Sequence, residues 1–122
     1  MDSNIYVPDD ETERSHDYRS GSRICTRVAG VTFDGRKAVI SRMSIGEKIL
    51  LKREPNNPYD HNAIRVERSN GQQIGYLNRH LASTLATIFE LHCHPVPAYV
   101  HCLTGSLRQG YSLGVVITFN VP

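Results

Sequence analysis

Residues 54–62 bring hydrogen-bonding and stacking groups together in one short polar segment. Tyr59 offers a ring on which an unpaired base can stack, and Asp60 beside it offers a hydrogen-bond acceptor. Further side-chain amides lie at Asn56, Asn57 and Asn62. Such groups on a rigid loop suit a site for single-stranded nucleic acid, but the same side chains also satisfy the backbone of tight turns. The residue types alone favour neither interpretation.

Strands are expected on both sides of this segment, which its two prolines exclude from any regular element. Residues 48–53 form an apolar run before it, and residues 64–67 alternate apolar and polar side chains after it. Asn70-Gly71 predicts a tight hairpin turn, from which residues 73–77 return as a further strand. The polar segment is therefore expected to be a loop mounted between two paired strands.

The rest of the chain predicts two helices and additional strands. A short helix is expected over residues 36–43, and a second helix follows Asn78, a predicted N-cap. The second helix should have about three turns, with one apolar face formed by Leu81, Leu85, Ile88 and Phe89. Residues 24–31, 96–103 and 111–121 read as strands, and the prolines at 95 and 97 place the second of these at a sheet edge. The fold class is therefore mainly β, a small closed or partly closed barrel with two short helices.

The formal net charge of +2 hides two parts of opposite sign. Residues 1–22 hold six acidic and two basic side chains, a net charge of −4, and are expected to form a disordered acidic tail. Residues 23–122 hold twelve basic and six acidic side chains, a net charge of +6, and are expected to form one folded domain. A basic domain is compatible with nucleic acid, although an ordinary basic surface explains the charge equally well.

Composition and cysteine usage exclude several protein classes. With 122 residues, 39% hydrophobic and 21% charged, the chain is neither a multidomain motor nor a disordered protein. No apolar run is long enough for a membrane span or a signal peptide. The three cysteines, Cys25, Cys93 and Cys102, are odd in number and far apart, which predicts free thiols in the cytoplasm rather than a disulfide scaffold.

Enzyme and metal motifs give no support for a catalytic function. The chain lacks a Gly-rich phosphate loop, a nucleophile elbow and a zinc-protease helix, so we expect neither an enzyme nor a cofactor. A group of possible zinc ligands consists of His92, Cys93, His94, His101 and Cys102. Adjacent residues in an extended segment point to opposite faces, so this spacing favours a structural role over a metal site.

The longest motif resembles the HIRAN domain family. It runs L-K-R-E-P-N-N-P-Y-D-H-N-A-I-R-V from Leu51, followed by N-G-Q-Q-I-G-Y-L ending at Leu77. The strand V-A-G-V-T-F before it and the final V-I-T-F also fit, so the resemblance covers about residues 24–121. It implies a six-stranded barrel similar to oligonucleotide-binding (OB) folds. It also implies a module that binds single-stranded DNA at its 3′-hydroxyl end, in DNA repair or replication-fork processing.

The resemblance also implies roles for individual residues. Asp60 would accept a hydrogen bond from the terminal 3′-hydroxyl, while Tyr59 and Phe33 would stack on the last bases. Asn57 would shape the end pocket, and Arg79 would contact a phosphate. The groove would be lined by Tyr76 and Tyr111.

Two positions depart from the pattern of the members that bind DNA ends. Thr32 stands where they carry arginine, and Tyr76 stands where they carry histidine. The feature that discriminates DNA binding from loss of DNA affinity is whether Thr32 is compensated near the groove by Arg27, Arg36 or Arg53. The expected partners are 3′ ends of single-stranded DNA and, for any remodelling, a helicase or nuclease supplied by another chain. The alternative is a protein-interaction adaptor that keeps the barrel without end-specific DNA binding.

Overall fold

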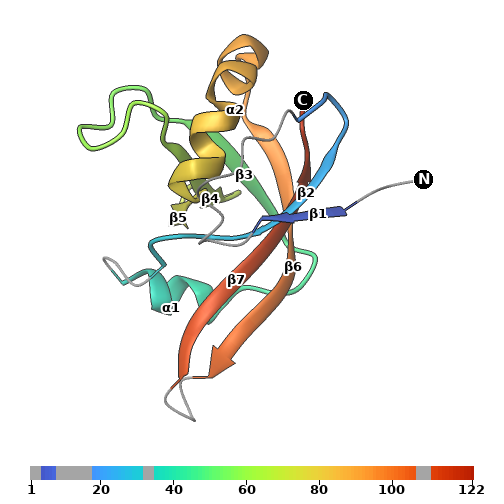
Figure 1. Ribbon diagram of the computed structural model, residues 1–122. Helices are drawn as coiled ribbons and strands as arrows, with labels where there is room; N and C mark the ends of the chain where they lie inside the picture. Colours follow the sequence, from blue (N-terminus) through green and yellow to red (C-terminus); the bar gives the residue numbers. More distant parts are fainter. Residues whose placement is uncertain (1–3, 8–17, 32–34, 107–110) are drawn as a thin grey trace.

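One curled sheet forms the body of the protein in the computed structural model, which describes residues 4–7, 18–31, 35–106 and 111–122. The strand order in this seven-stranded sheet is β1-β2-β7-β6-β3-β4-β5. The strands are β1 (Asn4–Val7), β2 (Arg23–Arg27), β3 (Lys48–Arg53), β4 (Ile64–Arg68), β5 (Gln73–Tyr76), β6 (Val96–Ser106) and β7 (Tyr111–Asn120). All the pairs formed among the strands from β2 through β7 are antiparallel, and these strands curl into a half-barrel (Figure 1). The predicted OB-like, mainly β fold is therefore confirmed.

The chain just after β2 meets β5 on the other side of the curl. Ala29 N donates to Tyr76 O over 2.8 Å, and Tyr76 N donates to Ala29 O over 3.0 Å. Gly75 permits this approach, because a Cβ atom there would collide with the carbonyl oxygen of Ala29 and a methyl group of Val28. We call this bridge between Ala29 and Tyr76 the barrel seam.

Two helices pack on this sheet, and both start where the sequence predicted, although the first ends at Ile40 rather than at residue 43. α1 (Arg36–Ile40) follows Gly35, which adopts a left-handed conformation with φ of 73°. α2 (Arg79–His92) starts at the predicted N-cap, where Asn78 Oδ1 accepts a 2.8 Å hydrogen bond from Leu81 N. With 14 residues, α2 has close to four turns rather than the expected three.

The apolar face predicted for α2 packs into the barrel interior. Leu81, Leu85 and Phe89 are buried, and Ile88 is half-buried against the same core. The sheet contributes inward side chains such as Ile49, Leu51 and Ile117, each without exposed surface. The core therefore lies between α2 and the concave face of the sheet (Figure 1). No helix in the described part of the chain is long and apolar enough to cross a membrane.

The prediction that the prolines place β6 at a sheet edge was wrong. β6 is paired with both β3 and β7 and lies near the middle of the strand order. Pro97 lies opposite Leu50 of β3, whereas the pairing with β7 begins only at Tyr99. Both prolines thus precede the doubly paired part of the strand, where a missing N–H would remove a ladder bond.

Part of the expected disordered tail is ordered in the structure. β1 pairs in parallel with β2, with Ile5 opposite Ile24, and Tyr18 packs into the core with 9% of its surface exposed. The physical reason is that residues 5–7, Ile-Tyr-Val, have high strand propensity and β2 would otherwise be an edge. For the remainder of residues 1–22, which lie largely outside the described ranges, the tail remains a prediction.

Candidate nucleic-acid interface

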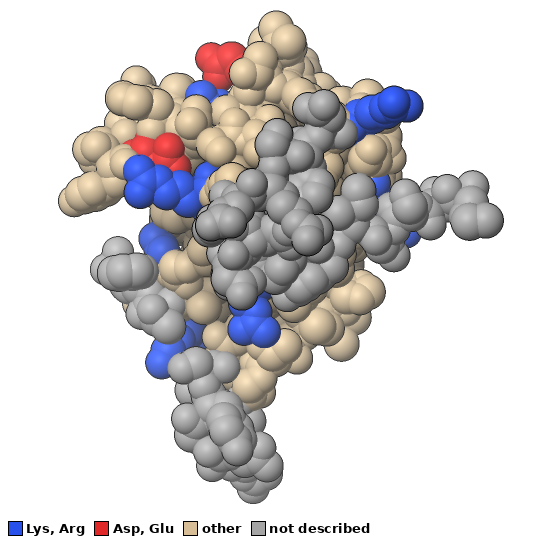
Figure 2. Space-filling view, viewed as in Figure 1, with Lys and Arg blue, Asp and Glu red and all other residues tan. Residues whose placement is uncertain are grey.

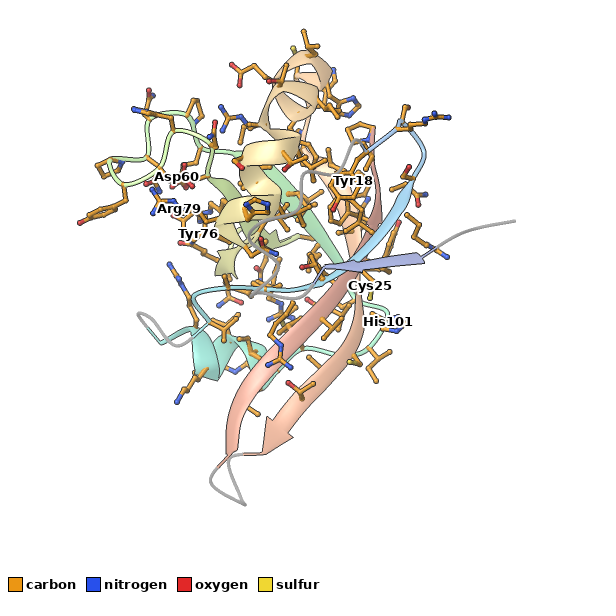
Figure 3. The ribbon with its side chains drawn as sticks, in the orientation of Figure 1. Tyr18, Cys25, Asp60, Tyr76, Arg79 and His101 are labelled. Atoms are coloured by element: carbon orange, nitrogen blue, oxygen red, sulfur yellow. The ribbon has the colours of Figure 1, made fainter. Side chains whose placement is uncertain are left out.

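A pocket of about 550 Å³ opens between the loop joining β3 to β4 and the chain after β2. The loop, residues 54–63, contributes one wall, and the barrel seam with the first residues of both helices contributes the rest. Predicted site residues in the lining are Asn57, Tyr59, Asp60, Tyr76 and Arg79. Figure 3 shows that Asp60, Tyr76 and Arg79 lie close together at one side of the half-barrel. The structure thus gathers residues that are up to 22 positions apart in the sequence.

Asn57 holds the 54–63 loop in shape. Its Oδ1 accepts hydrogen bonds from Tyr59 N at 2.8 Å and from Asp60 N at 3.1 Å. Its Nδ2 donates to Glu54 Oε1 at 2.7 Å. These bonds use both ends of the amide, so Asn57 shapes the pocket by fixing the backbone that carries Tyr59 and Asp60.

Asp60 divides its two carboxylate oxygens between the loop and Arg79. Oδ1 accepts a 2.9 Å hydrogen bond from Asn62 N, which closes a local turn. Oδ2 lies 3.8 Å from Arg79 Nε, and the side chain is 20% exposed. The turn interpretation therefore holds for Oδ1, whereas Oδ2 lies beside a cation at the pocket. A role of Asp60 in binding nucleic acid remains a prediction.

Glu54 is a pocket residue that the sequence analysis did not single out. Its Oε1 accepts a 2.7 Å hydrogen bond from the Tyr76 hydroxyl, and its Oε2 lies 3.9 Å from Arg65 Nη1. The sequence held no local signal for this role, because Tyr76 is 22 positions away and meets Glu54 only where β5 lies beside the loop. With Asp60, it gives the pocket a second carboxylate.

Arg36 packs over the ring of Tyr76. Its guanidinium carbon lies 5.7 Å from the ring centroid, and its Nη1 donates a 2.6 Å hydrogen bond to Gly30 O. The other two basic residues weighed as replacements for Thr32 lie elsewhere. Arg53 supports the loop through Nη1, which donates to His61 O at 2.8 Å, and Arg27 is an exposed residue of β2 opposite Val116.

The ring of Tyr59 stands in solvent at the rim of the pocket. The residue is 87% exposed, and its carbonyl oxygen accepts a 3.4 Å hydrogen bond from Arg79 Nη2. A large aromatic ring gains nothing for the fold at such exposure, whereas stacking against a base would bury it. Figure 2 shows Lys and Arg atoms on this side of the molecule, beside the loop and further down toward α1.

Three predicted site residues are not among the described residues that line this pocket. Thr32 and Phe33 lie outside the described residues. Tyr111 begins β7 opposite Ser106, at the end of the β6–β7 hairpin that points away from the 54–63 loop in Figure 1, and its side chain lies outside the described part. The roles of these three residues remain predictions.

The histidines and cysteines near the end of α2 are arranged without a common centre. The rings of His92 and His94 meet edge to face with centroids 5.9 Å apart, and Cys93 is exposed at the left-handed C-cap. Among the residues that the structure describes, no three side chains of the His, Cys, Asp or Glu type are grouped as metal ligands.

Comparison with known proteins decides the family. The sequence model of the HIRAN domain matches residues 23–118. The chain belongs to the HIRAN domain family. The crystal structure of the HIRAN domain of human HLTF is 30% identical, with a TM-score of 0.57 over 80% of this chain and 74% of that one. An NMR structure of the HLTF HIRAN domain in its DNA-bound conformation is 26% identical, with a TM-score of 0.53 over 82% of this chain and 73% of that one.

The HIRAN motif is also shared with much longer proteins. The helicase-like transcription factor of Oryctolagus cuniculus is 57% identical over 44 residues, which are 36% of this chain and 4% of that protein. The similarity to this relative is therefore confined to a small part of its length.

Proposed function

We propose that this HIRAN domain binds single-stranded DNA and holds its 3′-hydroxyl end in the pocket beside Asp60. The observation that carries the proposal is the position of Asp60 Oδ2, 3.8 Å from Arg79 Nε in a pocket rimmed by the exposed ring of Tyr59. A carboxylate, a guanidinium and a stacking ring are the groups that a terminal hydroxyl, a phosphate and a base require. The DNA-bound conformation known for the HLTF HIRAN domain supports this ligand class.

Selectivity for a free end follows from the charge of Asp60. A terminal 3′-hydroxyl can donate a hydrogen bond to the carboxylate, whereas a 3′-phosphate or a continuing strand would bring a negative group against it. Arg79 lies next to Asp60 Oδ2 and would attract the phosphate that precedes the terminal nucleoside. The pocket would thus accept the end of a strand and repel its interior.

Tyr76 changes the character of the pocket relative to a histidine. Its hydroxyl proton is directed to Glu54 Oε1 at 2.7 Å, so the phenol oxygen can act toward a ligand only as an acceptor. A protonated histidine at this position would add a positive charge. Phosphate attraction in this domain therefore depends on the arginines of the pocket.

A role in DNA repair or replication-fork processing would follow from binding a free 3′ end. The domain would act as a binding module, and a helicase or nuclease supplied by another chain would act on the DNA. The longer relatives that share the motif support an association with DNA-processing assemblies only as a proposal, because the shared segment covers 4% of the rabbit protein.

The proposal is tested by fluorescence anisotropy with strands ending in a 3′-hydroxyl or a 3′-phosphate, at two salt concentrations. Tighter binding of the hydroxyl-ended strand is expected at both. Asp60→Asn keeps an oxygen for the bond to Asn62 N but removes the charge, so it should reduce the preference for the hydroxyl end. Glu47→Gln is the matched control, since Glu47 pairs with Arg68 outside the pocket.

Equal and strongly salt-dependent binding of both strands would show generic backbone attraction and contradict end recognition. Absence of binding to either strand would favour the protein-interaction adaptor instead. Asp60→Ala removes the acceptor for Asn62 N, so loss of folding in Asp60→Ala, measured by circular dichroism, would favour the turn-satisfying role of Asp60.

A further inference from the structure

Arg36, the first residue of α1, lines the same pocket as the 54–63 loop but belongs to a different part of the chain. We propose that Arg36 binds a backbone phosphate of the strand whose end lies beside Asp60. The proposal rests on the proposed function, because it names a phosphate contact of the same site. It assigns to α1 a part in DNA binding that the motif of residues 51–77 does not contain.

The guanidinium of Arg36 is held by contacts from two different parts of the barrel. Arg36 Nη1 donates a 2.6 Å hydrogen bond to Gly30 O, on the chain after β2. The centroid of the Tyr76 ring, on β5, lies 5.7 Å from the guanidinium carbon. A planar group with a bond to one element and a ring beneath it has little freedom to rotate. A phosphate contact by Arg36 would therefore cost less side-chain entropy than a contact by a solvated arginine.

The position of Arg36 relative to Arg79 suits a polyanionic strand. Arg79 contacts the loop, with Nη2 donating to Tyr59 O at 3.4 Å and Nε at 3.8 Å from Asp60 Oδ2. Arg36 contacts the seam, beside Tyr76 and Gly30. The two guanidinium groups thus lie at different places in one pocket, and successive phosphates of a single strand can meet different cations.

Among the described residues that line the pocket, both carboxylates are on the loop, whereas Arg36 is on α1. Asp60 lies beside Arg79, and Glu54 accepts bonds from Tyr76 and Asn57. With the terminal hydroxyl beside Asp60 on the loop, the negatively charged backbone that leads to it would run past the seam, beside which Arg36 lies. Arg36 is the described pocket-lining cation on that side.

Arg36 also accounts for Thr32 better than the other candidates. Arg53 donates to His61 O and to Glu90 Oε2 at 3.1 Å, and neither it nor Arg27 is part of the pocket lining. Arg36, four residues further along the chain and the first residue of α1, would therefore supply the phosphate contact that the family pattern places at position 32.

The test combines a charge-removing variant with strands that lack one phosphate charge. Arg36→Gln is expected to weaken binding of a 3′-hydroxyl strand roughly 10-fold, the effect of one charge-assisted hydrogen bond. It should lower the slope of log affinity against log salt by about 0.7, the value for one single-strand phosphate. The preference for hydroxyl over phosphate ends should persist, because Asp60 is unchanged. Arg42→Gln is the matched control, since Arg42 is exposed just after α1 and outside the pocket lining.

Neutral methylphosphonate linkages, introduced one at a time near the 3′ end, identify the phosphate concerned. One linkage should weaken binding to the wild-type protein yet have no further effect in Arg36→Gln. Arg36→Lys keeps the charge without the planar fork and should retain most of the salt slope but lose part of the affinity. Thermal unfolding of each variant verifies that the fold is intact.

The outcomes separate this proposal from the function on which it rests. If the wild-type protein binds 3′-hydroxyl strands and Arg36→Gln behaves like Arg42→Gln, the Arg36 contact is wrong and the end-binding function stands. If every methylphosphonate effect is additive with Arg36→Gln, Arg36 contributes only a diffuse field and the proposal is likewise wrong. If the wild-type protein binds no strand, both proposals fail together.

Discussion

The Tyr76 hydroxyl donates a 2.7 Å hydrogen bond to Oε1 of Glu54, and Asn57 Nδ2 donates to the same oxygen at the same distance. One carboxylate oxygen therefore joins β5 to the 54–63 loop. The strand carries the seam and the loop carries Asp60, so this oxygen connects the wall of the pocket to its proposed end-binding residue. The geometry of the site depends on a residue that makes no proposed contact with DNA.

Tyr76→Phe should loosen this connection without unfolding the domain. Removing the hydroxyl leaves Glu54 Oε1 with the Asn57 bond, so we expect a loss of about 1 kcal/mol in the free energy of unfolding. Binding of the 3′-hydroxyl strand should weaken as the loop becomes less fixed. Chemical denaturation and anisotropy measure the two effects, and Tyr99→Phe, at an exposed position of β6, is the control. Unchanged affinity in Tyr76→Phe would show that the loop holds its shape without the bond.

Tyr59→Ala should separate binding from stability. The ring is 87% exposed, so its removal should leave the unfolding midpoint unchanged. Loss of base stacking should cost about 1–3 kcal/mol of binding free energy for hydroxyl-ended and phosphate-ended strands alike. Tyr99→Ala, which removes an exposed tyrosine outside the pocket, provides the comparison. An equal, small effect of both substitutions on anisotropy titrations would contradict a stacking role.

Gly75→Ala should be the most damaging glycine substitution at the seam. Its new methyl group would collide with the backbone carbonyl of Ala29, which cannot move without breaking the seam, so a cost above about 3 kcal/mol is expected. Gly46→Ala meets no atom within 4 Å and suffers only from its φ of 85°, which costs about 1–2 kcal/mol. Thermal melts of the two variants give the comparison. A Gly75→Ala protein as stable as Gly46→Ala would mean that the seam adjusts easily.

Cys25 should react slowly with alkylating reagents at neutral pH. Burial, assisted by repulsion from the Cys102 thiolate, raises the pKa of the Cys25 thiol above its ordinary value. Because the thiolate is the nucleophile, the rate should rise with pH and reach its midpoint above the ordinary cysteine range. Peptide mass spectrometry after timed iodoacetamide treatment measures the rate for each cysteine. A Cys25 profile with its midpoint at or below the ordinary value would contradict the raised pKa.

Local sequence signals predicted most of the elements, because each depends on neighbouring residues. Asn70-Gly71 specified the β4–β5 hairpin, and Asn78 with the apolar period that follows specified the start and face of α2. The position of β6 was not predictable from its prolines. It depends on which strands lie beside it, and the pairing with β7 begins only at Tyr99.

The candidate site was predictable only where its residues belong to the motif. Asn57, Tyr59 and Asp60 share one loop, so their proximity follows from the sequence. Arg36 could be weighed only as one of several basic residues, because its approach to Tyr76 requires the seam between distant segments. The supporting role of Glu54 likewise requires β5 to lie beside the loop.

The pocket lies across the barrel seam, with Gly30 and Arg36 on one side and Tyr76 and Asp60 on the other. Any opening of the seam would therefore pull the two halves of the pocket apart. Opening of the seam would weaken the binding of a DNA strand that contacts both halves. By thermodynamic linkage, the bound strand must stabilise the closed barrel by the same free energy. The amide protons of Ala29 and Tyr76, which form the seam, would then exchange with solvent more slowly in the complex than in the free domain. Bound DNA would thus stabilise the closed barrel of this domain as well as occupy its pocket.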